Sequence, residues 1–231
     1  MIYLLTDNNK ENILMQKLLD GIVKFKRGDF EIHKELFKSL KQKQKPHTLF
    51  ITCSDSRLDP NMITGSLPGE LFVIRNIANI VPVYGKDLEN VAITSAIEYA
   101  VLVLKVENII VCGHTDCGGC TASLYGTLLP ETSKWLKVIE PVRSRILKEY
   151  KDDEPQIQEW MMEQNNVVEQ LKHLLTYPYI KKKVSKGMLT LNGWHYSIED
   201  GNIRIYNKEL SSFILANDEI SHEKASINNK E

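Results

Sequence analysis

Hydrophobic residues at the start of the chain follow a helical spacing. In residues 11–27 and again in residues 29–43, apolar side chains recur at intervals of three and four, and Gly28 separates the two stretches. The positions that carry this spacing are Ile13, Leu14, Leu18, Ile22 and Val23, and then Ile32, Leu36 and Leu40. The pattern predicts two helices, which form an N-terminal helical arm over residues 1–45.

The centre of the chain alternates short apolar runs with helical patterns. We predict strands at residues 48–52, 71–75 and 108–111, and helices at residues 59–64, 89–104 and from about Cys117. Alternation of this kind favours a parallel sheet with helical crossovers. The predicted fold class is therefore α/β, with a mainly parallel central sheet flanked by helices.

The remainder of the chain continues the same domain. Residues 132–175 have a mostly helical pattern, in which Pro141 and Pro155 mark starts or breaks. Residues 188–196 and 203–206 are typical of two strands joined by a turn at residues 200–202. The polar tail over residues 218–231 is expected to be disordered. We expect one domain over residues 1–231.

The composition excludes several classes of partner. The chain has 231 residues, with 29 Lys and Arg against 30 Asp and Glu, so its charge offers no basis for binding nucleic acid or an anionic membrane. It has no apolar stretch of about 20 residues and no signal-peptide pattern, which predicts a cytoplasmic protein. Three of the four cysteines, Cys112, Cys117 and Cys120, are clustered, which favours metal or redox chemistry over a disulfide framework.

Two motifs follow predicted strands. Cys53-Ser-Asp55-Ser-Arg57 follows the strand at 48–52, and His114-Thr-Asp-Cys117-Gly-Gly follows the strand at 108–111. The carboxyl ends of parallel strands are where α/β sheets form sites. Two thiolates and one imidazole suit Zn²⁺, and three protein ligands leave one position open for chemistry. If residues 53–57 are extended, Cys53, Asp55 and Arg57 project to one side.

Both motifs resemble those of the β-class carbonic anhydrases, C-x-D-x-R and H-x-x-C-G-G. The similarity spans positions 25 to 216 and includes further blocks in the family's order: Gln44 and residues 68–70, 72–79, 96–100, 174–178 and 193–196. Phe50 stands three residues before Cys53, where one branch of the family has tryptophan. This difference resembles the plant-type branch and implies an open zinc site.

The resemblance implies a zinc-dependent enzyme that hydrates CO2 reversibly to bicarbonate and a proton by zinc-bound hydroxide. Cys53, His114 and Cys117 would be the metal ligands. Asp55, held by Arg57, would be catalytic, and in a closed state Asp55 could become the fourth ligand. The residues implied to bind substrate are Gln44, Phe72, Ile77, Tyr99, Gly118 and Gly119.

The resemblance also implies an assembly. In the family, the N-terminal helices pack on a neighbouring subunit, so we expect a homodimer or a dimer of dimers. The pocket glutamine and aromatic groups are then contributed partly by the partner.

Other interpretations remain open. On the same fold, the substrate could be carbon disulfide or carbonyl sulfide. Cys117 and Cys120 also form a C-x-x-C redox motif, and Cys112, His114, Cys117 and Cys120 could form a closed zinc knuckle. A different class of alternative is a non-catalytic zinc or thiol protein that has kept the fold.

Overall fold

The computed structural model describes residues 8–85 and 91–217. The chain divides into two compact units, residues 1–44 and residues 45–231. The predicted tail, and residues 89–90 of the helix predicted at 89–104, lie outside the described residues.

The first unit is helical, as the spacing predicts. It contains α1 (Asn8–Arg27), α2 (Asp29–Ile32) and α3 (Lys34–Leu40). The break at Gly28 is confirmed, whereas the predicted second helix is interrupted at His33, whose φ of −100° and ψ of 19° leave the helical region. The rings of Phe25, Phe30 and Phe37 pack on one another, with Phe30 and Phe37 stacked at 5.2 Å.

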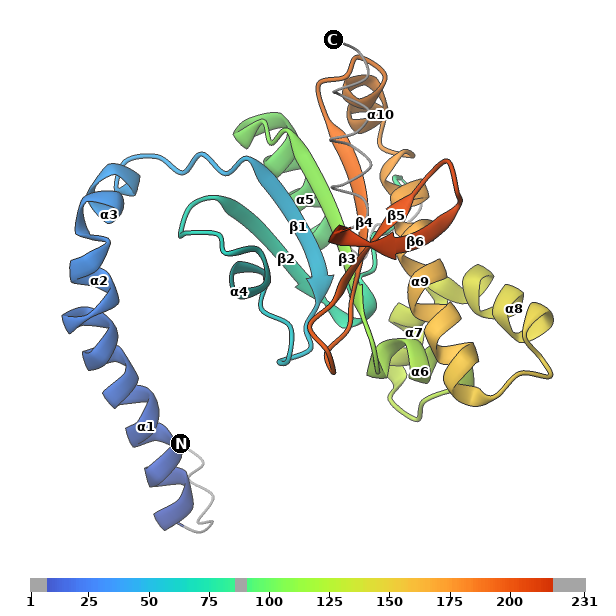
Figure 1. Cartoon of the computed structure of the whole chain (residues 1–231), viewed down its shortest axis with the longest axis horizontal. Coiled ribbons are helices and arrows are strands. Elements are labelled where there is room, and N and C mark those ends of the chain that lie inside the picture. Colours follow the sequence, from blue (N-terminus) through green and yellow to red (C-terminus); the bar gives the residue numbers. More distant parts are fainter. Residues whose placement is uncertain (1–7, 86–90, 218–231) are drawn as a thin grey trace. The chain divides into compact units, whose positions relative to one another are not determined.

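The second unit is built on one sheet with the strand order β2-β1-β3-β4-β5-β6 (Figure 1). Its strands are β1 (Thr48–Cys53), β2 (Leu71–Asn76), β3 (Asn108–His114), β4 (Thr190–Tyr196), β5 (Ile203–Asn207) and β6 (Ser212–Leu215). Strands β1 to β4 are parallel to one another. Strand β5 runs antiparallel to β4, and β6 runs antiparallel to β5. The predicted mainly parallel sheet is confirmed, and β6 is an addition to it.

Helices of the second unit follow most of the predicted positions. They are α4 (Pro60–Thr64), α5 (Val91–Glu98), α6 (Gly118–Tyr125), α7 (Pro130–Leu136), α8 (Glu140–Glu149), α9 (Pro155–Leu174) and α10 (Pro178–Val184). Short 3₁₀ segments occur at Ile77–Asn79 and Lys137–Ile139. The helix that begins as α5 continues as a π-helix over Tyr99–Leu104, and α10 is not among the predicted elements.

Strand β1 is buried along its whole length, which explains its uninterrupted apolar sequence. Leu49 and Ile51 belong to the core on one face of the sheet, and Phe50 packs on the other face against Trp194, with ring centroids 5.8 Å apart. Both faces of the central strands are therefore occupied by side chains, which fixes the position of the strand ends.

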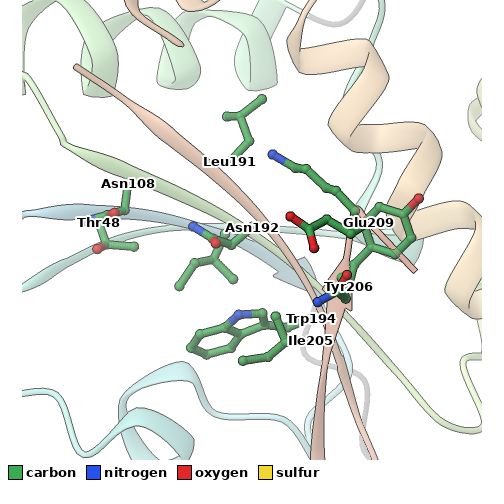
Figure 2. Close-up of a pocket in the computed structure, with 11 residues that line it drawn as sticks. Thr48, Asn108, Leu191, Asn192, Trp194, Ile205, Tyr206 and Glu209 are labelled. Carbon is green, nitrogen blue, oxygen red and sulfur yellow. The ribbon is translucent and has the colours of Figure 1, made fainter. Parts of the chain in front are cut away.

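A cavity of about 480 Å³ lies at the amino ends of the parallel strands (Figure 2). Thr48 and Asn108, the first residues of β1 and β3, line it together with residues of β4 and β5. The two motifs follow the opposite ends of β1 and β3. This cavity is therefore separate from the candidate site.

Candidate metal centre

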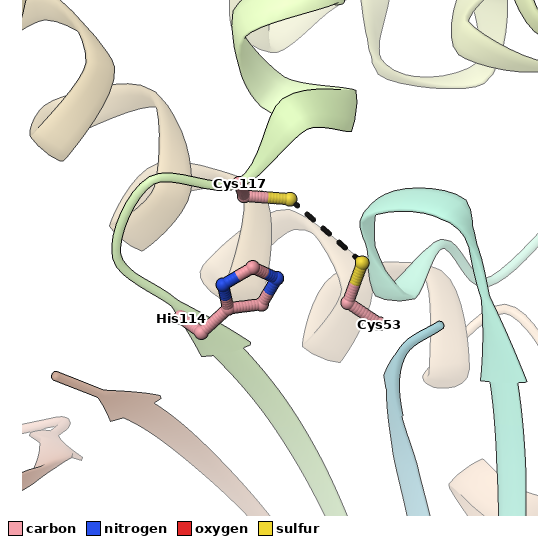
Figure 3. A group of neighbouring side chains, drawn as sticks. All are labelled: Cys53, His114 and Cys117. Carbon is pink, nitrogen blue, oxygen red and sulfur yellow. Dashed lines mark hydrogen bonds between the residues drawn. The ribbon is translucent and has the colours of Figure 1, made fainter. Parts of the chain in front are cut away.

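The structure brings the three predicted zinc ligands together (Figure 3). Cys53 is the last residue of β1, His114 is the last residue of β3, and Cys117 immediately precedes α6. Their ligating atoms all lie within 4.8 Å of one another. The cluster forms because β1 and β3 are neighbouring parallel strands that end at the same edge of the sheet.

The two sulfur atoms have the separation that a zinc ion requires. Cys53 Sγ and Cys117 Sγ are 3.9 Å apart. Two sulfurs that each lie about 2.3 Å from zinc in a tetrahedral arrangement would be roughly 3.8 Å apart. A disulfide bond, at about 2.05 Å, is far shorter. The pair therefore fits a shared metal ion, and both side chains are buried.

The His114 imidazole presents an unprotonated nitrogen to the sulfurs. Its Nδ1 lies 2.8 Å from the Thr115 carbonyl oxygen, which can only accept a hydrogen bond, so Nδ1 carries the proton. In the neutral imidazole, which is the form that binds a metal, Nε2 then has a free lone pair. It is fully buried and has no hydrogen-bond partner among the residues that the structure describes. A buried polar atom without a partner is costly, and a metal ion at the cluster would satisfy it.

The metal-free thiols hold their protons. The hydrogen bond between Cys53 and Cys117, together with burial, raises the pKa of Cys53 to about 12. The pKa of Cys117 is also raised, chiefly by its hydrogen bond with Cys120. Because zinc binds the thiolate form, both protons have to leave when the metal enters.

Asp55 and Arg57 form an ion pair beside the cluster. The Arg57 Nε donates to Asp55 Oδ1 at 3.0 Å, and Nη2 donates to Oδ2 at 2.8 Å. The segment does not continue as a strand beyond Cys53, so the one-sided arrangement of an extended segment does not apply. The chain turns instead, because the Arg57 backbone N–H donates to Asp55 Oδ1 at 2.9 Å and closes an Asx turn.

This pairing controls the charge of Asp55. The hydrogen bonds from the Arg57 side chain hold the pKa of Asp55 well below its usual range, against a smaller opposing effect of burial. Asp55 Oδ2 lies 4.0 Å from His114 Nε2. The ionised Asp55 carboxylate therefore lies beside the three candidate ligands and remains paired with Arg57.

Arg75 holds the first motif in place. Its guanidinium donates to the carbonyl oxygens of Cys53 at 3.2 Å, Asp55 at 2.6 Å and Leu58 at 2.6 Å. Arg57 makes a comparable bond across the site, from Nη2 to the Asp116 carbonyl at 3.0 Å. The sequence includes Arg75 in a family block, but nothing in its position along the chain indicates this bracing.

Ile77 and the two glycines lie next to the cluster. A Cβ on Gly119 would come within 2.8 Å of Ile77 Cγ2 and 2.9 Å of Ala78 Cβ. A Cβ on Gly118 would have no neighbour within 4 Å in the described part of the chain. Ile77 thus packs against the first turn of α6, two residues after Cys117. The backbone at Gly118 stays open.

Two further predicted substrate residues, Phe72 and Tyr99, lie away from the cluster. In the register of β1 and β2, Phe72 lies opposite Leu49, and Cys53 lies opposite Asn76. Phe72 is therefore four residues, or roughly 13 Å along the strand, from the level of Cys53. The Tyr99 ring is 6.2 Å from the Phe72 ring. Phe72 and Tyr99 of one chain are therefore distant from the same chain's cluster, and Gln44 is the last residue of the first unit.

Comparison with known proteins identifies the family. A family model described as carbonic anhydrase matches residues 48–203. A Helicobacter pylori carbonic anhydrase is 40% identical over 220 residues, covering 90% of this chain and 97% of that protein. The solved β-carbonic anhydrase CcaA shares 42% identity at a TM-score of 0.84, over 87% of this chain and 98% of that one. The chain belongs to the β-class carbonic anhydrases.

A further solved relative is described as tetrameric. It is one of two β-carbonic anhydrases from the ascomycete Sordaria macrospora, 31% identical at a TM-score of 0.71, over 86% of this chain and 97% of that one. The present chain is, with these relatives, a zinc-dependent carbonic anhydrase that hydrates CO2 reversibly to bicarbonate and a proton. Hydrolysis of a sulfur analogue and a non-catalytic role are not favoured.

The closed zinc knuckle is not favoured in this β-carbonic anhydrase. Among the described residues, the group of His, Cys, Asp and Glu side chains that could hold a metal consists of Cys53, His114 and Cys117. Cys112 is fully buried in the sheet and directs its thiol to the Gly113 carbonyl at 3.4 Å.

Over residues 8–85 and 91–217, no helix combines the length and apolar character needed to span a membrane.

A buried glutamate and histidine complete the surroundings of this β-carbonic anhydrase centre. Glu163 of α9 accepts a hydrogen bond from the Cys117 backbone N–H at 3.0 Å, and its other oxygen lies 3.0 Å from His195 Nε2. The sequence pattern does not single out either residue. Only the packing of α9 against β3 and β4 reveals the connection.

Proposed function

We propose that Cys53, His114 and Cys117 hold the catalytic zinc of this carbonic anhydrase. The observation that carries the proposal is the buried, unpartnered Nε2 of His114, which faces two sulfurs at the spacing of zinc thiolates. When bound, zinc lowers the pKa of a water ligand from about 16 to near 7 and so supplies a nucleophile at neutral pH. Three protein ligands would leave a coordination position for that water.

We further propose that Asp55 orients the reacting water. An ionised carboxylate only accepts hydrogen bonds, so Asp55 can fix the direction in which the water oxygen presents its lone pair to CO2. Arg57 keeps the carboxylate ionised and limits its rotation through charge-assisted bonds to both oxygens. Held in this way, Asp55 does not act as a ligand, which supports an open site in a chain with Phe50 in place of tryptophan.

We propose that the substrate pocket is shared between two subunits. Ile77, Gly118 and Gly119 would line it from the chain that supplies the ligands, and Gln44, Phe72 and Tyr99 would come from its partner. The separation of Phe72 from Cys53 in one chain supports this division. CO2 is small and apolar, so an apolar wall with a single amide donor from Gln44 would suit it and the bicarbonate product.

This pocket requires a homodimer, and we propose a homodimer or a dimer of dimers. The first unit supports the proposal, because Leu14, Leu18, Ile22 and Phe25 are exposed along α1. Four apolar side chains on one helix face favour a protein partner over water. We also propose a cytoplasmic location, because a zinc–thiolate site needs reduced cysteines.

Stopped-flow CO2 hydration by the zinc-replete protein tests this function, with Cys53→Ser as the control. We expect fast turnover in the wild type and, in the variant, loss of both bound zinc and turnover. Parallel assays with carbonyl sulfide and carbon disulfide separate the substrates. Turnover of a sulfur gas without CO2 hydration would overturn the substrate assignment, and retention of stoichiometric zinc by Cys53→Ser would overturn the ligand assignment.

A further inference from the structure

Glu163 is a buried carboxylate with two defined contacts. It lies on α9 and is 3% exposed. Oε1 accepts from the Cys117 backbone N–H and Oε2 from His195 Nε2, each at 3.0 Å. Burial of a charged group is costly unless it is paired, so these contacts are strongly preferred once the helix is in place.

His195 is oriented by that carboxylate. The imidazole is fully buried on β4, with its ring 4.8 Å from Trp160 and 6.2 Å from Phe213. Because an ionised carboxylate only accepts, Nε2 carries the proton that the pair shares. Nδ1 is buried and has no hydrogen-bond partner within residues 8–85 and 91–217. The polar contact that anchors this ring is therefore the one with Glu163.

Two glycines in the sheet allow α9 to approach it closely. A Cβ on Gly113 would lie 2.8 Å from Val167 Cγ2, and a Cβ on Gly193 would lie 2.9 Å from Val167 Cγ1. Gly113 directly precedes His114 and pairs with His195 in the sheet register. The close packing at Val167 brings Glu163, one turn earlier on α9, to the loop between His114 and Cys117.

That loop needs to be held in its conformation. Asp116, which precedes Cys117, adopts a left-handed φ of 55°, which costs energy in a residue other than glycine. Cys117 itself is extended, at φ −74° and ψ 106°, before α6 begins. The Cys117 N–H has no place in the hydrogen-bonding pattern of the helix, and Glu163 is its acceptor.

We propose that Glu163 and His195 form a positioning pair that holds Cys117 in its ligating conformation. His195 fixes the rotamer of Glu163, and Glu163 fixes the backbone from which the Cys117 thiolate is directed at the metal. The proposal rests on Cys117 being a zinc ligand, as stated above. Groups that hold metal ligands in this way typically contribute 10- to 100-fold to metal affinity.

Zinc affinity of the folded variants is the decisive measurement. Competition with a chromophoric chelator gives the zinc dissociation constant, and circular dichroism confirms that each protein is folded. We expect Glu163→Ala and His195→Leu each to weaken zinc binding by about 10-fold or more. Glu163→Gln keeps an acceptor for Cys117, and His195→Gln keeps a donor for Glu163, so both should stay closer to the wild type.

A matched control lies on the same helix. Glu159, one turn before Glu163, accepts from the Thr121 hydroxyl at 3.3 Å, and no hydrogen bond to a metal ligand is seen for it among the described residues. Glu159→Gln should leave the zinc dissociation constant unchanged. If the two residues act as one unit, Glu163→Ala combined with His195→Leu should weaken zinc binding no more than Glu163→Ala alone.

Different results separate this proposal from the assignment of the ligands. Wild-type zinc affinity in folded Glu163→Ala or His195→Leu, with only the melting temperature lowered, would reduce the pair to a fold-stabilising contact and overturn the proposal. If Glu163→Ala does not fold, His195→Leu decides by the same criterion. Stoichiometric zinc in Cys117→Ser would instead refute the ligand assignment.

Discussion

Asp55 and Arg57 are joined by three hydrogen bonds, two from the guanidinium and one from the Arg57 backbone, within a turn of three residues. The carboxylate is thereby held at 4.0 Å between Oδ2 and His114 Nε2, next to the metal ligands but committed to arginine. In this position, Asp55 can orient the reacting water without taking the water's place.

Replacement of Arg57 by Gln should release Asp55. The variant loses the bidentate pair, and the freed carboxylate can turn towards the metal. We expect kcat/KM for CO2 hydration to fall by about 10- to 100-fold while zinc content stays stoichiometric. Stopped-flow kinetics and metal analysis of the same preparation check this. Unchanged kcat/KM would mean that the turn alone positions Asp55.

Replacement of Asp55 by Ala should separate catalysis from metal binding. We expect the variant to retain one zinc per chain and to lose most of its CO2 hydration activity, because the water loses its hydrogen-bond acceptor. Zinc content and stopped-flow rates are the measurements. Loss of zinc from this variant would identify Asp55 as an obligatory ligand.

Zinc uptake should release protons and become tighter as the pH rises. Because the pKa of Cys53 is raised to about 12 and that of Cys117 is raised as well, both thiols are protonated near pH 7 in the metal-free protein. Two displaced protons give an apparent affinity that increases about 100-fold per pH unit. Calorimetry in buffers of different ionisation enthalpy counts the protons. Release of fewer than one proton per zinc ion would contradict the raised pKa values of the two thiols.

The CO2 hydration activity should rise above neutral pH. Two thiolate ligands donate more charge to the metal than imidazoles do, so the reacting water is less acidic than at a three-histidine site. The pKa of Asp55 lies far below this range, so Asp55 does not set the rise. A pH profile of kcat/KM provides the measurement, and a flat profile between neutral and alkaline pH would oppose this view.

Gly119→Ala should destabilise the protein more than Gly118→Ala. The added methyl at position 119 meets Ile77 and Ala78 at under 3 Å, whereas position 118 is open. Overpacking of this kind typically costs about 1–3 kcal/mol. Urea unfolding of the two variants compares the free energies directly. Equal stabilities would show that the segment around Ile77 yields easily.

Much of this architecture can be predicted from local pattern. The buried run of β1 and the Pro and Gly boundaries of the helices are local signals, and the two motifs are visible because each directly follows a strand. Strand β6 is harder to predict, because it is only four residues long and partly exposed at the edge of the sheet. The π-helical stretch is held partly by Lys183, which donates to the Val101 carbonyl from 82 residues away.

Most contacts around the metal ligands depend on how segments that are distant in the sequence pack in the folded chain. Asp55 and Arg57 pair through a turn rather than an extended segment, because the Asx hydrogen bond competes with the extended backbone. Glu163 reaches Cys117 from 46 positions away, and His195 reaches Glu163 from a separate strand. No spacing along the chain encodes these distances, since they follow from how closely α9 packs on two glycines.

The position of the ligands also determines how a metal ion can leave. Cys53 and His114 are the last residues of two neighbouring strands of the same sheet. Their backbones cannot move apart unless the hydrogen bonds between β1 and β3 break. Cys117 lies outside the sheet, at the end of a three-residue connection. We therefore expect movement of this short connection, rather than opening of the sheet, to set the rate of metal exchange.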